Sequence, residues 1–227
     1  MLKLEKTFIC NWEGALRGMR NPMNSWDRSD TDFDKADFIY VGHDDSVVSA
    51  PVIGPNDLEL MKKLAAGGPV HAKYRRQIFV SVDITAPLYW WKEFDTYKVG
   101  TTANSCSTMH KIHSKEFTLE DFSHEHLIDE GENSWLWAFN AFLIGLNSAR
   151  KLYLETKDKK YWWQMIQSLP TSYNQKRTVT LDYENLVNIH KWRRHHKLDE
   201  WHTFCDWIES LPYAKDVIFV EETSSAE

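Results

Sequence analysis

The segment from Gln77 to Thr85, QIFVSVDIT, constrains the fold more than any other part of the chain. Aliphatic side chains recur in it at every second position, at Ile78, Val80, Val82 and Ile84. Side chains with that spacing share one face of a β-strand. Ala86-Pro87 then precedes LYWWKEFDTYK, a helical pattern with proline at a permitted first-turn position. The sequence therefore predicts a strand with one buried face that leads directly into a helix.

The second half of the chain has the spacing of amphipathic helices. Four stretches carry it, at residues 132–156, 162–169, 181–195 and 199–211. In the third, Leu186, Ile189 and Trp192 fall on one side and are expected to be buried. In the fourth, the same pattern predicts an inward face, made of Trp201, Phe204, Cys205 and Ile208.

The first half is predicted as shorter elements. Residues 2–10 are expected to form a strand and residues 38–41 another. Asn11 is expected to cap a helix that ends at Arg20, and Asn56 one that stops at Gly67-Gly68. The acidic segment 24–36 is interpreted as a loop, either a lid or a linker, and residues 42–55 are interpreted as loop-like.

Together these elements predict an α+β protein, with a small mixed sheet and a dominant helical layer. The chain has 227 residues, 42% of them hydrophobic and 26% charged, an ordinary globular composition. We expect a single domain over residues 1–216, followed by a disordered tail at 217–227.

Charge and cysteine content narrow the possible partners. The formal net charge of -6 argues against non-specific binding to nucleic acid, but it leaves room for one anion held by local basic residues. Three widely spaced cysteines favour reduced thiols. No secretory signal and no membrane-spanning stretch is recognisable, so a cytoplasmic location without membrane contact is expected.

Polar residues on the helix at 181–195 and at its end form the first candidate site, namely Asn185, Asn188, His190, Arg193, Arg194, His195 and His196. Arginine forks suit a phosphate or carboxylate, and asparagine amides suit the edge of a base. The alternative is a solvated face whose basic residues favour the helix C-terminus.

The remaining candidate groups are weaker. The loop GTTANSCSTMHK offers small hydroxyl and amide groups that could cradle a ligand, although most polar loops are only loops. His124 and His126 could face one way on a strand, but no accompanying motif has metal-ligand spacing, so no metal is expected. The sequence contains no GxGxxG, P-loop, GxSxG or HExxH motif.

Three stretches within residues 56–210 resemble the flavin-dependent thymidylate synthases, the ThyX family. They are GGPVHAKYRRQIFVSVDITAPLYWWKEF, the loop that follows it, and SLPTSYNQKRTVTLDYENLVNIHKWR. The chain also looks like the small ThyX-like proteins that phages and prophages encode. The resemblance implies a homo-oligomer, a tetramer in that family, which binds FAD and dUMP and methylates the uracil with a folate and NADPH.

The resemblance also implies roles for particular positions. Asn188 matches a flavin-contacting Asn, and Asn185 and His71 are assigned to the same cofactor region. Asp182 and Glu184 stand where the family has Asn and Arg. Nucleotide contacts are expected at Tyr97, Lys98, Asn104, Arg177, Arg193 and Arg194.

The family's catalytic signature is degenerate here. Thr96, Tyr97 and Lys98 stand for its Arg-His-Arg, and catalysis needs such cations to hold phosphate and polarise uracil. Three functions follow as hypotheses. The first is a nucleotide-binding protein, which could sequester a nucleotide or nucleotide-derived signal in phage counter-defence. The second is a divergent flavin-dependent pyrimidine nucleotide methyltransferase that uses FAD, and the third is an interaction protein that keeps only the fold.

Overall fold

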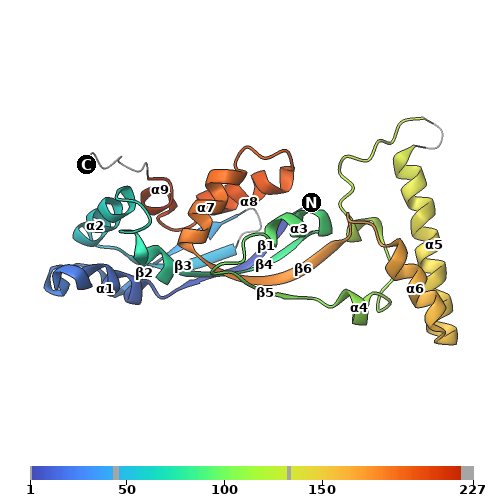
Figure 1. The fold of residues 1–227 in the computed structure, drawn as a ribbon, viewed down its shortest axis with the longest axis horizontal. Helices are drawn as coiled ribbons and strands as arrows, with labels where there is room; N and C mark the ends of the chain where they lie inside the picture. Colours follow the sequence, from blue (N-terminus) through green and yellow to red (C-terminus); the bar gives the residue numbers. More distant parts are fainter. Residues whose placement is uncertain (1, 43–45, 132–133, 221–227) are drawn as a thin grey trace. The chain divides into compact units, whose positions relative to one another are not determined.

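The computed structural model describes residues 2–42, 46–131 and 134–220, which fall into two compact units. Unit 1 comprises Met1–Leu2, Thr85–Thr96 and Asn104–Arg177, and unit 2 comprises Lys3–Ile84, Tyr97–Ala103 and Thr178–Glu227. A four-stranded sheet has the order β1-β4-β6-β5, and a second sheet pairs β2 with β3 (Figure 1). The mixture of small sheets and many helices confirms the predicted α+β class.

Unit 2 holds the N-terminal elements and the last helices. These are β1 (Lys3–Cys10), α1 (Trp12–Arg20), η1 (Asn21–Met23), η2 (Trp26–Arg28), β2 (Asp32–Val41), β3 (Ser46–Val52), α2 (Pro55–Ala66), η3 (Lys73–Gln77), most of β4 (Phe79–Pro87), the end of β6 (Asn174–Asp182), α7 (Tyr183–Arg193), α8 (Asp199–Ser210) and α9 (Ala214–Val217).

The strand predicted from alternation is confirmed as β4. Ile78, Val80, Val82 and Ile84 are all buried, as one face of a strand on a core requires. Helix α8 matches its prediction equally well, because Trp201, Phe204, Cys205 and Ile208 are completely buried. Large aromatic side chains also belong to this core, with the Trp12 ring edge-on to Tyr183 at 5.5 Å between ring centroids.

The polar segment 24–36 is not simply a loop, and the prediction for it is corrected. Asp32 begins β2, which pairs antiparallel with β3 in the register Phe38↔Ser49. The segment also fixes the start of α2, because Asp30 accepts hydrogen bonds from the backbone N–H groups of Asn56 and Asp57. Asn56 therefore lies inside α2, and Gly54 occupies the N-cap position.

Two further expectations for side chains are wrong. Trp192 is 68% exposed, although Leu186 and Ile189 of the same helix α7 are buried. Asn11 has a positive φ and makes no side-chain cap for α1; its amide nitrogen donates to the Gln77 carbonyl at 2.8 Å instead. Both residues fit a helical pattern, but tertiary contacts decide where their side chains lie.

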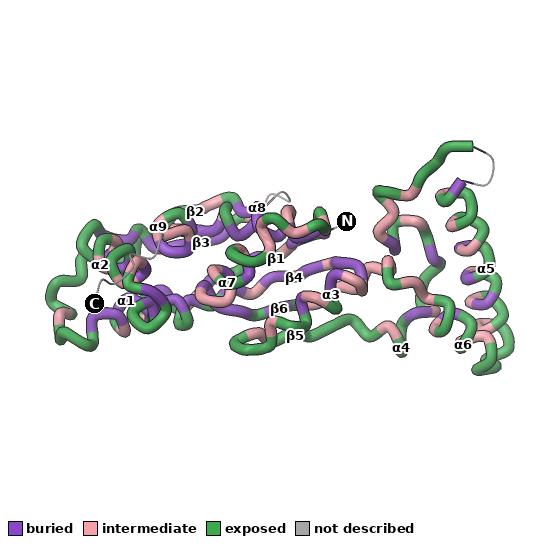
Figure 2. The backbone as a smooth tube through the Cα atoms, turned by 45° about the horizontal axis from the view of Figure 1, so that its top comes forward, coloured by how far each residue is buried: buried purple, intermediate pink, exposed green. Residues whose placement is uncertain are grey.

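Unit 1 contains α3 (Leu88–Phe94), α4 (Thr108–Lys111), η4 (Leu119–Asp121), α5 (Trp135–Thr156), α6 (Lys159–Ser168), the end of β5 (Thr102–Ser105) and the start of β6. Helices α5 and α6 pack side by side (Figure 1). Their core contains Leu143, Leu146 and Met165, together with Phe117 and Phe122 from the preceding loop. Much of the length of α5 is nevertheless exposed (Figure 2).

The C-terminal boundary lies slightly later than composition predicts. Val217 ends α9 and, like Ile218, is buried, so ordered structure passes the expected limit at residue 216. Residues 221–227 of the predicted tail lie outside the described residues. Among the described residues, no helix is long and apolar enough to cross a membrane.

Candidate functional site

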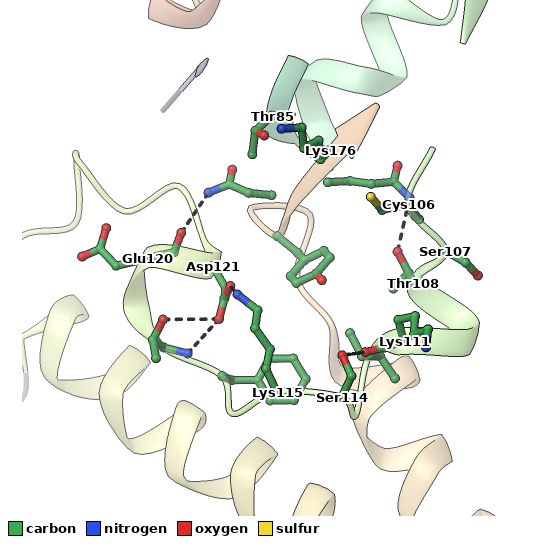
Figure 3. Close-up of a pocket in the computed structure, with 16 residues that line it drawn as sticks. Thr85, Cys106, Ser107, Thr108, Lys111, Ser114, Lys115, Glu120, Asp121 and Lys176 are labelled. Carbon is green, nitrogen blue, oxygen red and sulfur yellow. Dashed lines mark hydrogen bonds and ion pairs between the residues drawn. The ribbon is translucent and has the colours of Figure 1, made fainter. Parts of the chain in front are cut away.

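A cavity of about 410 Å³ opens within unit 1, and we call it the unit 1 pocket. Its wall is formed by the end of β4, the segment around α4, the turn at η4 and the start of β6 (Figure 3). The lining residues are Thr85, Cys106, Ser107, Thr108, Lys111, Ile112, Ser114, Lys115, Phe117, Thr118, Glu120, Asp121, Tyr173, Asn174, Gln175 and Lys176. Its volume is in the range typical of small-molecule sites.

The chain that follows β5 is held against β6 by hydrogen bonds. The Cys106 backbone N–H donates to the Lys176 carbonyl at 2.9 Å. The Gln175 side-chain nitrogen donates to the Cys106 carbonyl at 3.1 Å and to the Thr108 hydroxyl at 3.3 Å. These bonds fix two walls of the pocket relative to each other. A rigid wall of this kind is what allows a site to present polar groups at defined positions.

The pocket carries three lysines and two acidic residues. Lys115 pairs with Asp121, whose other oxygen accepts a hydrogen bond from the Thr118 backbone N–H at 2.9 Å. Asp121 is thus compensated by the cation beside it and by the capping box of η4. Lys111 of α4 and Lys176 of β6 add positive charge to the lining, and the exposed carboxylate of Glu120 adds one negative charge. The pocket can therefore receive an anion.

Tyr173 and Asn174, where β6 begins, add an aromatic ring and an uncharged amide to the lining of the pocket. Burial raises the pKa of the Tyr173 phenol, and the nearby charges of Asp121 and Cys106 raise it further, so the hydroxyl stays protonated at neutral pH. The Asn174 side-chain oxygen is buried and accepts no hydrogen bond from any described residue. A flat aromatic wall beside an unsatisfied amide suits a heterocyclic ligand.

One of the three free thiols lies on this pocket. Cys106 is exposed, and Figure 3 shows its sulfur among the lining side chains. Cys205 is buried in unit 2, where loss of solvation raises the pKa of its thiol to about 12. Cys10 is only partly buried.

Two residues expected to contact a nucleotide lie in unit 1 beside this wall. Arg177 follows Lys176, stacks on the Trp91 ring at 4.1 Å and binds the Asp95 carboxylate at 2.7 Å. Its Nε also donates to the Gln175 side chain at 3.0 Å, so it supports a lining residue rather than lining the pocket itself. Asn104 lies exposed on β5, two residues before Cys106.

The other four, Tyr97, Lys98, Arg193 and Arg194, lie in unit 2. Arg193 donates to the Tyr97 hydroxyl at 2.8 Å, and its guanidinium lies 4.7 Å from the Trp201 ring centroid. Arg194 pairs with Asp206 at 2.5 Å and with Glu209 at 3.3 Å. Lys98, which follows Tyr97 in the sequence, is exposed. The contacts of Arg193 and Arg194 are those of residues that fasten α7 to its neighbours.

The residues assigned to the cofactor region have largely structural partners. Asn185 accepts from the Asp182 backbone N–H at 3.2 Å and donates to the Val99 carbonyl at 2.8 Å, completing the N-terminal capping box of α7. Glu184 lies 3.6 Å from the buried Arg75 guanidinium. His71 is exposed, with its ring against Gly67, and Asn188 is exposed on α7.

These positions do not fit a flavin as the resemblance assigns them. A flavin dinucleotide carries a pyrophosphate, which an arginine stabilises and the Glu184 carboxylate repels. Burial raises the pKa of Asp182, but its carboxylate is occupied in capping α7 rather than available to a ligand.

The histidine pairs do not assemble a metal centre in the part of the chain that the structure describes. No group of three or more metal-ligating side chains was found there. The His124 ring nitrogen lies 2.9 Å from the Phe122 carbonyl, while His126 is exposed.

Sequence reasoning found only one wall of the pocket. The loop GTTANSCSTMHK contributes Cys106, Ser107, Thr108 and Lys111, as its small polar composition suggested. Thr118, Tyr173, Asn174 and Lys176 were missed, because nothing in their local pattern distinguishes them from ordinary turn and strand residues. Their common feature is spatial: η4 and β6 bring them to the same cavity.

Comparisons with known proteins identify the fold. No protein-family model matches the sequence, and no curated protein is significantly similar to it. Thymidylate synthase X (ThyX) from Helicobacter pylori, solved with FAD and dUMP, matches with a TM-score of 0.62 and 14% identity over 96% of each chain. The UMP/dUMP methylase PolB from Streptomyces cacaoi, bound with 5-Br dUMP, matches with a TM-score of 0.58 and 11% identity over 97% of this chain and 95% of that one. The chain therefore has a ThyX-like fold.

Proposed function

We propose that this protein binds a pyrimidine nucleoside monophosphate in the unit 1 pocket and does not synthesise thymidylate. The observation that carries the proposal is the joint presence, in one cavity of about 410 Å³, of lysines, hydroxyls, a buried amide and an aromatic wall. A nucleotide has both an anionic and a heterocyclic end, so it matches both halves of this lining.

The phosphate is assigned to the lysine side of the pocket. Lys111 and Lys176 can neutralise a dianion, with the hydroxyls of Ser107 and Thr108 as neutral donors. Asp121 does not oppose this, because Lys115 and the η4 cap hold its carboxylate. A lysine ammonium binds phosphate as a point charge, without the two parallel hydrogen bonds that an arginine guanidinium makes. The groups that contact the base therefore have to orient the ligand.

The base is assigned to the side formed by Tyr173 and Asn174. The Tyr173 ring supplies a surface for stacking, and the Asn174 amide supplies a hydrogen-bonding edge. Solved proteins of the same fold are described with dUMP, 5-Br dUMP and 5-Br UMP bound, which supports the choice of a pyrimidine nucleotide as the ligand. At such low identity, the residues of this pocket carry the argument and the fold alone does not.

Sequestration is the use that we propose for such binding. Holding a nucleotide or nucleotide-derived signal, for example as a phage-encoded counter-defence protein, requires affinity but no reductant and no methyl donor. The degenerate signature at Thr96, Tyr97 and Lys98 is compatible with that use, since the cations a methyl transfer would need are mostly replaced.

A second candidate is a divergent flavoenzyme acting on a pyrimidine nucleotide, because one solved structure of this fold holds FAD together with dUMP. The acidic Asp182 and Glu184 argue against it.

A homo-oligomer, by resemblance a tetramer, is proposed on the exposed aromatics Trp135 and Trp137 of α5, because such side chains are common at subunit interfaces. A partner protein on the same face is the third candidate.

The first experiment identifies what the purified protein carries. The full chain is purified, its visible spectrum is recorded, and the small molecules released on denaturation are identified by mass spectrometry. A colourless protein that releases a pyrimidine nucleotide is the expected result. Flavin absorbance with released FAD would overturn the non-enzymatic proposal in favour of the flavoenzyme.

The second experiment tests the pocket directly by calorimetric titration with UMP and dUMP. Lys111→Ala should weaken binding about tenfold, since it removes one cation from the phosphate side. Lys151→Ala is the matched control, because Lys151 is an exposed lysine of α5 outside the pocket. Equal affinity in both variants, or no binding by the unmodified protein, would contradict the assignment.

A further inference from the structure

The charge of the chain is unevenly distributed, and one segment of unit 1 is basic. The chain as a whole has a formal net charge of -6. Residues 150–160 instead contain five basic and two acidic side chains, a net charge of +3. Salt screens the interaction between exposed charges beyond about 10 Å, so a charged partner responds to this segment rather than to the charge of the whole chain.

A two-residue turn brings three lysines together on the surface. Helix α5 ends at Thr156 and α6 begins at Lys159, so Lys157 and Asp158 form the whole connection. Lys157, Lys159 and Lys160 are all exposed. Asp158 caps α6 by accepting from the Lys160 backbone N–H at 3.0 Å, and its other oxygen pairs with the Lys160 ammonium at 3.1 Å. One carboxylate beside three ammonium groups leaves the turn positively charged.

A tryptophan ring lies beside these lysines and is held in place by its neighbour. Trp163 is 42% exposed, and the Lys159 ammonium lies 5.6 Å from its ring centroid. Its ring stands edge-on to that of Trp162, with 4.8 Å between the ring centroids. Trp162 packs against the core of unit 1, and its indole N–H donates to the Met109 carbonyl at 3.3 Å. An exposed ring that is fixed in this way is pre-organised for stacking.

The exposed side of α6 adds two amides to the cations and the ring. Gln164 and Gln167 are exposed, whereas Met165 is buried in the core. We call the exposed side chains of the turn and the helix the α6 face, namely Lys157, Lys159, Lys160, Trp163, Gln164 and Gln167.

The composition of the α6 face favours a nucleic acid over a lipid surface. Lysines neutralise phosphates, an indole stacks on a base, and glutamine amides donate and accept along a base edge. Helices that lie in a membrane interface expose leucine or phenylalanine as well as tryptophan. The exposed residues of α6 include no Leu, Ile, Val or Phe.

A second exposed Lys–Trp pair, at the end of α7, lacks this combination. The Lys191 ammonium lies 5.9 Å from the ring centroid of Trp192, which is 68% exposed. The next two cations, Arg193 and Arg194, are held by side chains of unit 2. This pair therefore provides matched control variants.

We propose that the α6 face binds single-stranded nucleic acid, with Trp163 stacking on an unpaired base and the three lysines neutralising phosphates. The strand has to be unpaired, because the bases of a duplex stack on each other and offer no face to the indole. None of these residues lines the unit 1 pocket. The inference therefore goes beyond the proposed function and does not depend on it.

The test is fluorescence anisotropy of the full chain with a labelled strand of about 15 thymidines, at about 50 mM salt. Binding should saturate and should weaken with salt, with a slope of log K against log salt of about -2 for three neutralised phosphates. A duplex of the same length should bind at least about tenfold more weakly, because it offers no base for stacking.

Two variants divide the contribution of the ring from that of the charge. Trp163→Ala should weaken binding of the strand about tenfold and leave the salt slope unchanged. Lys157→Asn should reduce the slope by about 0.7, and asparagine tolerates the left-handed backbone at this position, where φ is 58°. Trp192→Ala and Lys191→Ala are the matched controls and should keep the affinity and the slope of the unmodified protein. Circular dichroism and the melting temperature monitor the fold of each variant.

Several results would overturn this inference while leaving the nucleotide pocket standing. They are no saturable binding of the strand, equal affinity for strand and duplex, and a loss in Trp192→Ala as large as that in Trp163→Ala. Binding to phosphatidylglycerol vesicles without binding to the strand would also overturn it, because the α6 face would then recognise lipid headgroups. Titration with UMP tests the pocket separately, since none of these variants changes a residue that lines it.

Discussion

Arg20 and Asp57 form an ion pair that is almost completely shielded from solvent, with 2.6 Å between the Arg20 Nε and the Asp57 Oδ1. The other oxygen of Asp57 accepts hydrogen bonds from the hydroxyls of Ser29 and Thr31, each at 2.7 Å. The carboxylate thus joins α1, α2 and the segment between them. This places a charged group in the core of unit 2, where each partner depends on the other.

The first prediction is that Asp57→Ala strongly destabilises the protein. The substitution leaves the Arg20 guanidinium buried without its counter-charge, which costs about 3–5 kcal/mol of the free energy of unfolding. Urea denaturation of the full chain measures it. Asp34→Ala, at an exposed position on β2, is the control and should change the free energy of unfolding by less than about 0.5 kcal/mol. A comparable loss of unfolding free energy in both variants would show that the buried ion pair contributes no more than an exposed carboxylate.

The second prediction concerns the pH dependence of the same group. Burial acts to raise the pKa of Asp57, but hydrogen bonds from Thr31, Ser29 and Arg20 outweigh it and hold that pKa below the ordinary value of 3.8. Because the pKa is lower in the folded state, its contribution to stability is complete above 3.8 and is lost as the pH falls through the folded-state value. Acid titration of the melting temperature should show a smaller decline over this range in Asp57→Asn than in the unmodified protein. Parallel curves would rule out Asp57 as a source of acid sensitivity.

The third prediction tests the pocket through its thiol. Cys106 is exposed on the pocket wall, whereas the buried Cys205 has a pKa of about 12 and stays unreactive. In a Cys10→Ser background, iodoacetamide at about pH 8 should therefore label Cys106 first. Saturating UMP should slow that labelling several-fold, as peptide mass spectrometry would record. Labelling that UMP leaves unchanged would mean that the nucleotide does not occupy the space beside Cys106.

Local pattern was a good guide wherever a single element buries one face. The alternation at 78–84 and the helical spacing at 201–208 each describe a row of side chains against a core, and both rows are buried. Local sequence pattern gave a wrong prediction where contacts between residues far apart in the sequence determine the structure. The acidic residues of 24–36 suggested a loop, but Asp30 caps α2 and residues from Asp32 onward pair with β3. Acidic composition says nothing of a partner strand elsewhere in the chain.

The candidate site was harder to predict than the fold for a related reason. The unit 1 pocket combines residues near 85, 106–121 and 173–176, and only the middle stretch looked like a ligand-binding loop. Arg193 and Arg194, which were predicted to contact a nucleotide, are not among the residues that line this pocket. Arg193 and Arg194 are held by side chains of their own unit, because a long cationic side chain beside aromatic rings and carboxylates finds partners within the fold.

The fourth prediction follows for Arg193. Its guanidinium bonds the Tyr97 hydroxyl and stacks on Trp201, so Arg193→Ala should lower the free energy of unfolding by about 1–2 kcal/mol while leaving UMP affinity unchanged. The resemblance to ThyX implies the opposite, a loss of about 2 kcal/mol in anion affinity with little effect on stability. Urea denaturation and UMP titration of the same variant decide between them. Lys191→Ala, from the same helix, controls for the loss of a positive charge.

The fifth prediction uses Glu184, which stands where the resemblance places a flavin-binding arginine. Arg75 is only 3% exposed, and the Glu184 carboxylate lies 3.6 Å from its guanidinium. Glu184→Arg should therefore destabilise the protein by about 3–5 kcal/mol, because it exchanges a counter-charge for a second cation beside a buried one. Glu184→Gln, which removes the charge but keeps the shape, should cost less. If Glu184→Arg were instead stable and bound FAD, as absorbance after incubation with FAD would reveal, then this position would still belong to a flavin site and the Arg75 pair would be incidental.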